Sequence, residues 1–96
     1  MPKHHVSRNW IWETVLTAIQ QQTGINQILI DADDDLVQIK CDPILVLESM
    51  QTSLERKCRV ELRITDGNYL IDINTVDDLV AAVIAIISNK KVSITD

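Results

Sequence analysis

The sequence predicts an α+β domain in which helices alternate with β-hairpins. Apolar residues recur at helical spacing in three segments, 10–23, 43–58 and 76–88, and they alternate with polar residues in the stretches between these segments. The chain has 96 residues, of which 46% are hydrophobic and 24% are charged, which is typical of a globular protein with one core. We therefore expect residues 1–9 to form a flexible tail and residues 10–96 to form a single domain.

The first half of the chain predicts a helix, a hairpin and a second helix. Residues 10–23 form the first helix, and Gly24 ends it. Residues 28–30 and 37–39 alternate apolar and polar side chains on either side of the acidic segment 31–35, which predicts two short strands. Asp42 and Pro43 are typical of an N-cap and a first helical position. The helix that follows has one apolar face, made of Leu47, Met50, Leu54 and Cys58.

The second half predicts another hairpin, a third helix and a short last strand. Residues 60–64 and 69–73 alternate in register around Asp66-Gly67, a pair that favours a two-residue turn. Thr75 is a good N-cap, and Asp77 and Asp78 carry negative charge in the first helical turn, where the helix dipole favours it. Residues 92–94 alternate and predict the last strand.

The charge of the chain limits what it binds. There are 9 Lys and Arg residues against 14 Asp and Glu residues, so the formal net charge is −5. Such a domain is a poor candidate for coating nucleic acid or an anionic membrane. No apolar run approaches the roughly 20 residues of a membrane span, and the N-terminus has no apolar core of a signal peptide. We expect a soluble, cytoplasmic protein.

The sequence offers little chemistry. Cys41 and Cys58 are predicted to be buried thiols, and no cysteine or histidine spacing is typical of zinc. Four aspartates mimic a calcium loop, but Leu36 stands where such a loop needs glycine, so a solvated acidic turn is the better interpretation; the four are Asp31, Asp33, Asp35 and Asp42. We predict no catalytic residue, no cofactor and no metal, and hence a protein that is not an enzyme.

The segment ITDGNYLIDINTVDDL, residues 64–79, resembles the acidic motif of the Phox-and-Bem family of ubiquitin-like interaction domains. The resemblance implies a ubiquitin-like core over 26–95, with a two-hairpin sheet and two packed helices, preceded by an extra helix at 10–24. It also implies an adaptor or scaffold that binds the Lys/Arg-rich face of a partner protein. The partner-binding residues would be Asp66, Asn68, Asp77 and Asp78.

Two alternatives stay open. Residues 24–48 and 74–83 are similar to the loop, second helix and last helix of acyl carrier proteins. Pro43, or Ile44 in an ungapped alignment, stands where those proteins carry the phosphopantetheinylated serine. The chain would then be a degenerate carrier that cannot be loaded. A small acidic chaperone-like adaptor is the other alternative, and the helix that bears Trp10 and Trp12 could supply an apolar contact surface.

Overall fold

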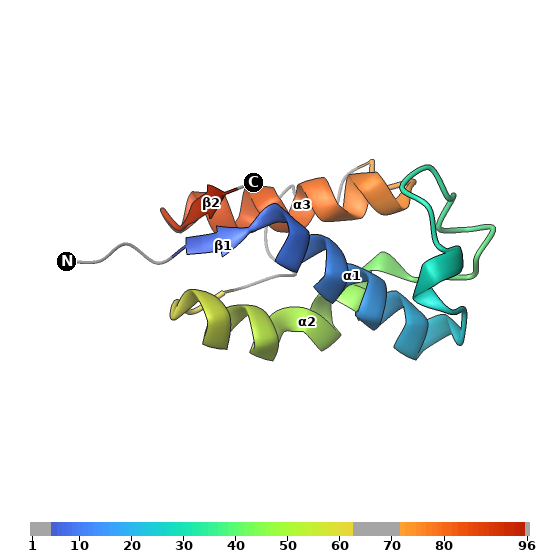
Figure 1. Cartoon of the computed structure of the whole chain (residues 1–96), viewed down its shortest axis with the longest axis horizontal. Coiled ribbons are helices and arrows are strands. Elements are labelled where there is room, and N and C mark those ends of the chain that lie inside the picture. The colour runs from blue at the N-terminus through green and yellow to red at the C-terminus, as the bar shows by residue number, and fades with distance from the viewer. Residues whose placement is uncertain (1–4, 63–71, 96) are drawn as a thin grey trace.

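The computed structural model describes residues 5–62 and 72–95 and contains both helices and strands within them. In chain order the elements are β1 (His5–Ser7), α1 (Arg8–Thr23), the 3₁₀ turn η1 (Gln27–Leu29), α2 (Pro43–Cys58), α3 (Val76–Asn89) and β2 (Ser93–Thr95). Figure 1 shows α1 between α2 and α3, with β1 and β2 side by side at one end of the bundle. The α+β expectation is therefore confirmed at the level of class.

The helices begin and end where the sequence provides caps. The Ser7 hydroxyl accepts a hydrogen bond from the Trp10 amide at 3.0 Å, so α1 starts slightly earlier than its apolar period indicates. Gly24 ends α1 with a φ of 78°, a left-handed conformation that costs glycine little. The Asp42 carboxylate accepts from the Ile44 amide at 2.9 Å and caps α2, as predicted.

The core lies between the three helices. The predicted apolar face of α2 is buried, and it packs with apolar side chains from α1 and α3 in one cluster. The fully buried members include Ile11, Val15 and Ile19 from α1, Leu47 and Leu54 from α2, and Leu79, Val83 and Ile87 from α3. Area removed from water at each of these positions stabilises the bundle by about 1.5–3 kcal/mol relative to exposure.

The two ends of the chain form the small sheet. β1 and β2 are parallel, and Val6 lies opposite Ile94. Residues 5–9 are expected to belong to a flexible tail, but in the structure they form β1 and the start of α1. Val6 is only 1% exposed and is part of the core, which holds this segment in place. The predicted last strand is present, displaced by one residue.

The prediction of the first hairpin is wrong. Residues 28–30 and 37–39 are not strands, because side chains compete locally for the backbone amides. The Asn26 carboxamide oxygen accepts from the Ile28 amide at 3.0 Å, and the Asp35 carboxylate accepts from the Val37 amide at 2.9 Å. These bonds turn the chain, so the expected two-hairpin sheet lacks its first hairpin.

The second predicted hairpin and the Asp66-Gly67 turn lie mostly outside the described residues. Of the flanking residues, 60–62 and 72–74 are irregular. Leu62 is fixed to α2, since its amide donates to the Glu55 carboxylate at 3.0 Å and its carbonyl accepts from Gln51 Nε2 at 3.1 Å.

Candidate partner-binding surface

The start of α3 is held by a reciprocal pair of hydrogen bonds. The Thr75 hydroxyl accepts from the Asp78 amide at 3.1 Å. The Asp78 carboxylate in turn accepts from the amides of Asn74 at 3.0 Å and Thr75 at 3.1 Å. This capping box satisfies amides that the helix itself leaves without partners.

The capping box gives Asp78 a structural role. The Asn74 and Thr75 amides that donate to its carboxylate, with the Thr75 hydroxyl, lower the pKa of Asp78 below its ordinary value of 3.8. The neighbouring Asp77 is exposed and takes no part in the cap. Of these two acids, only Asp77 has a carboxylate without a partner within residues 5–62 and 72–95.

A distant acidic segment lies against this helix start. The Asp77 amide donates to the Ala32 carbonyl at 2.9 Å, the Val76 amide to the Asp34 carbonyl at 3.1 Å, and the Leu36 amide to the Asn74 carbonyl at 2.9 Å. An isolated antiparallel bridge joins Asp35 to Thr75 within this pairing. Backbone bonds therefore fix the turn at 31–35 beside the first turn of α3.

The acidic residues of the turn divide into two groups. Asp34 and Asp35 shape it, because their carboxylates accept from the amides of Asp31 at 2.8 Å and Val37 at 2.9 Å. Asp31 and Asp33 are exposed, as is Asp77, and within residues 5–62 and 72–95 these three carboxylates accept no hydrogen bond and form no ion pair. We call Asp31, Asp33 and Asp77 the acidic surface.

Exposed apolar side chains flank the acidic turn 31–35 in the sequence. Ile28 and Leu29 in η1 are 84% and 71% exposed, and Val37, after the acidic turn, is 83% exposed. Large apolar side chains this exposed are typical of contact surfaces when they gather near one another. The sequence pattern predicts strands at Ile28 and Val37. Because the structure has no strand at either residue, both side chains are exposed to solvent.

The structure describes only two of the four residues that the resemblance assigns to partner binding, Asp77 and Asp78. Asp66 and Asn68 lie outside the described residues. Asp31 and Asp33 were interpreted from sequence as a solvated turn, with no link to residue 77. Only a pairing between the two segments could have shown their proximity, and neither segment has the alternating pattern that predicts one.

The cysteines and acids offer no sign of metal or thiol chemistry in the part of the chain that the structure describes. There, no group of three or more His, Cys, Asp or Glu side chains could hold a metal ion. Cys41 and Cys58 are buried and unpaired, as predicted. Burial, with the nearby Asp42 charge, raises the pKa of Cys41 to about 11, and burial also raises the pKa of Cys58. Both thiols therefore stay protonated at neutral pH.

No helix among the described residues is long and apolar enough to cross a membrane. Comparison of the chain with models of protein families, with curated proteins and with solved structures finds no match.

Proposed function

We propose that this protein is a non-catalytic protein–protein interaction module whose acidic surface binds a basic partner. One observation supports this most directly: backbone hydrogen bonds hold the 31–35 turn, which bears the exposed Asp31 and Asp33, beside the first turn of α3, which bears the exposed Asp77. A fixed group of like charges costs mutual repulsion in the isolated protein, and a Lys- or Arg-bearing partner relieves it.

The partner should combine positive charge with apolar contacts. Ile28, Leu29 and Val37 would give up their exposed area to a partner, while the carboxylates of the acidic surface would select its charge. Complementary charge mainly raises the association rate and excludes wrong partners. A face on which Lys and Arg surround apolar side chains satisfies both requirements.

The proposal keeps the function implied by the Phox-and-Bem resemblance and revises its residues. The acid-acid-Leu triplet at 77–79 does open a helix, as that resemblance implies. The absent strands at 28–30 and 37–39 weigh against a ubiquitin-like core. The acidic surface does not depend on that core, because the 31–35 turn and α3 position it directly.

A capture experiment with matched charge changes tests the proposal. We would compare the parent chain with Asp33→Lys/Asp77→Lys and with the control Glu48→Lys/Glu61→Lys as baits in extract of the native cells. Glu48 and Glu61 are exposed acids of α2 and the segment after it, so both pairs change the net charge equally. We expect the first pair alone to lose the partners that the parent recovers, at low and at moderate salt. Equal recovery by the three baits would contradict the proposal.

The second candidate function is that of a carrier-like protein that cannot be loaded. The irregular segment before α2, together with α2 and α3, favours it, because the acyl carrier resemblance implies a loop and two helices at these places. Asp42, the last residue before the expected serine position, caps α2. Pro43 occupies the position of the modified serine. Such a protein would still act through contacts with partners.

A mass measurement separates a loadable carrier from this candidate. After incubation with a phosphopantetheinyl transferase and coenzyme A, we expect an unchanged mass, since no hydroxyl follows Asp42. The nearest serines on α2 are Ser49, whose hydroxyl donates to the Val46 carbonyl at 2.8 Å, and Ser53. A mass gain of one phosphopantetheine would show that the chain is a carrier.

A further inference from the structure

A second charged feature lies at the C-terminal end of α2. An open cleft of about 490 Å³ is lined by Trp10, Ser53 and three cationic residues, which are Arg56, Lys57 and Arg59. Lys57 Nζ lies 5.6 Å from the centre of the Trp10 ring, which places the ammonium over the aromatic face. Among the described residues no Asp or Glu side chain lines this cleft. We call it the basic cleft.

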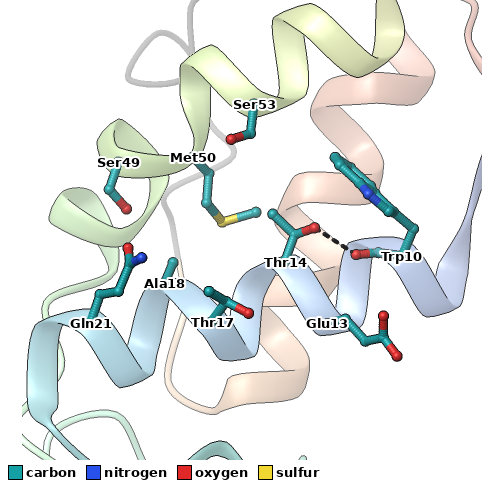
Figure 2. A pocket seen from close by; sticks show the side chains of 9 residues that line it. All are labelled: Trp10, Glu13, Thr14, Thr17, Ala18, Gln21, Ser49, Met50 and Ser53. Carbon is teal, nitrogen blue, oxygen red and sulfur yellow. Dashed lines mark hydrogen bonds between the residues drawn. The ribbon is translucent and has the colours of Figure 1, made fainter.

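The basic cleft adjoins a groove between α1 and α2. Figure 2 shows this groove, of about 300 Å³, with Trp10 and Ser53 at the end that it shares with the cleft. Its floor is apolar, since Met50 is 2% exposed and Ala18 is 6% exposed. Its sides carry the hydroxyls of Thr14, Thr17 and Ser49, and its lining also includes the Gln21 carboxamide and the Glu13 carboxylate. A ligand that fills both cavities therefore meets cations in the basic cleft and the apolar side chains of Met50 and Ala18 along the groove, with Gln21 and Ser49 at the far end.

The hydroxyls along the groove differ from the Ser53 hydroxyl in whether they can donate a hydrogen bond to a ligand. Thr14 Oγ1 donates to the Trp10 carbonyl at 2.7 Å, and Ser49 Oγ donates to the Val46 carbonyl at 2.8 Å. Their donors are occupied, so they offer only lone pairs to a ligand. Ser53 donates to no acceptor within the described residues, and its hydroxyl stays available beside the arginines.

We propose that the basic cleft and the adjoining groove bind a small phosphate monoester. The phosphate would lie among Arg56, Lys57 and Arg59 with the Ser53 hydroxyl as a further donor, and the organic group would lie against Trp10 and Met50. Guanidinium groups present paired donors that match phosphate oxygens. Positive charge at the end of α2 also complements the helix dipole, but that accounts for neither the concave shape nor the aromatic wall.

A small ligand fits better than a macromolecule. The combined cavities fall within the range of small-molecule sites, which is about 300–1,000 Å³. The chain as a whole carries a charge of −5, which disfavours the long polyanion of a nucleic acid. The basic cleft is a local exception in an acidic molecule, so a compact anion is the ligand that it can hold.

The test is a titration followed by the indole N–H signals of the two tryptophans, in a phosphate-free buffer. The probes are phenyl phosphate, inorganic phosphate and phenol, and Trp12→Phe assigns the two signals. We expect phenyl phosphate to shift the Trp10 signal saturably, with a dissociation constant of about 1 mM or lower. Inorganic phosphate and phenol should each bind more weakly. Phosphate binding as tightly as phenyl phosphate would overturn the assignment of the groove to an organic group.

Two pairs of substitutions distinguish the basic cleft from general charge. Arg56→Gln/Arg59→Gln changes the cleft, and Lys90→Gln/Lys91→Gln removes the same charge beyond α3. The two pairs are matched in backbone conformation, because each replaces one residue that has a positive φ, which is 55° at Arg59 and 61° at Lys91. We expect the arginine pair to weaken phenyl phosphate binding about tenfold or more, and the lysine pair to change it less than about twofold. Equal weakening, or no saturable shift with the folded parent, would overturn the proposal.

Discussion

Neighbouring carboxylates in this protein have different tasks. Asp78 closes the capping box of α3, whereas the exposed carboxylate of Asp77, one residue earlier, has no partner among the described residues. In the acidic turn, the Asp34 carboxylate accepts from the Asp31 amide, whereas Asp33 is exposed and likewise has no partner in the described ranges. A sequence motif scores such neighbours as equivalent. Only the hydrogen-bonding partners separate the acid that folds the chain from the acid available to a partner.

The pH dependence of stability should reveal the task of Asp78. Its pKa is lowered in the folded state, so its ionised form stabilises that state: the contribution is complete above the ordinary value of 3.8 and is lost as the pH falls through the lowered folded pKa. We expect Asp78→Asn to lower the free energy of unfolding at about pH 7, with the difference from the parent shrinking as the pH falls from about 4 towards 2.

Urea unfolding across this pH range measures the effect, and Asp77→Asn is the control because it removes an acid of the same helical turn that is outside the capping box. A loss for Asp77→Asn as large as that for Asp78→Asn would show that only the helix dipole matters.

The three helices were predictable as elements, and the segments between them were not. Each helix combines a 3.6-residue apolar period with a capping residue directly next to it in the sequence, such as Thr75 before α3. The strands predicted at 28–30 and 37–39 rested on alternation alone, and the side chains of Asn26 and Asp35 provide amide partners that a strand would have found in a sheet. Alternation over three residues is too short to outweigh such bonds.

Local sequence patterns also did not predict the contacts between segments that lie far apart in the sequence. β1 pairs with β2, and the turn at 31–35 pairs with the start of α3. Both pairings depend on how the helices pack, which no short segment encodes. Of the acidic surface, the sequence motif assigns only Asp77 to partner binding, because the position of Asp31 and Asp33 beside the start of α3 follows from the tertiary fold.

The buried face of α2 can be tested with one residue type on one helix. Leu54 is fully buried, whereas Leu45 is 52% exposed. We expect Leu54→Ala to lower the free energy of unfolding by about 2–5 kcal/mol, because it leaves a cavity between the helices. Leu45→Ala should change it by less than about 0.5 kcal/mol. Chemical denaturation of the two variants measures both; similar losses would mean that the face of α2 is assigned wrongly.

At the scale of the whole molecule, charge is distributed along the long axis. The described part of the chain measures 43 Å along this axis. Figure 1 shows the C-terminal ends of α2 and α3 near β1 and β2, while the N-terminus of α3 and the 31–42 segment lie towards the opposite end. Cations gather at the first end, in Arg56, Lys57, Arg59, Lys90 and Lys91. The acidic surface lies at the second end, so the two proposed binding sites are separate.

In the proposed interaction, this separation would orient an approaching partner. The acidic surface would attract a basic protein and the basic cleft would repel it, which would favour one docking orientation before contact. Salt should weaken this guidance, since the screening length is about 10 Å at 0.1 M ionic strength and about 3 Å at 1 M. The effect of salt should appear in the association rate more than in the dissociation rate.

The association rate of the partner recovered by the parent bait, measured at two salt concentrations, tests the central claim most directly. We predict that Asp33→Lys/Asp77→Lys slows association and weakens binding at least about tenfold, equivalent to about 1.4 kcal/mol, and abolishes most of the salt dependence. Glu48→Lys/Glu61→Lys, with the same net charge, should stay close to the parent. If the two pairs slow association equally, overall charge and not the acidic surface guides the partner, and the account is contradicted.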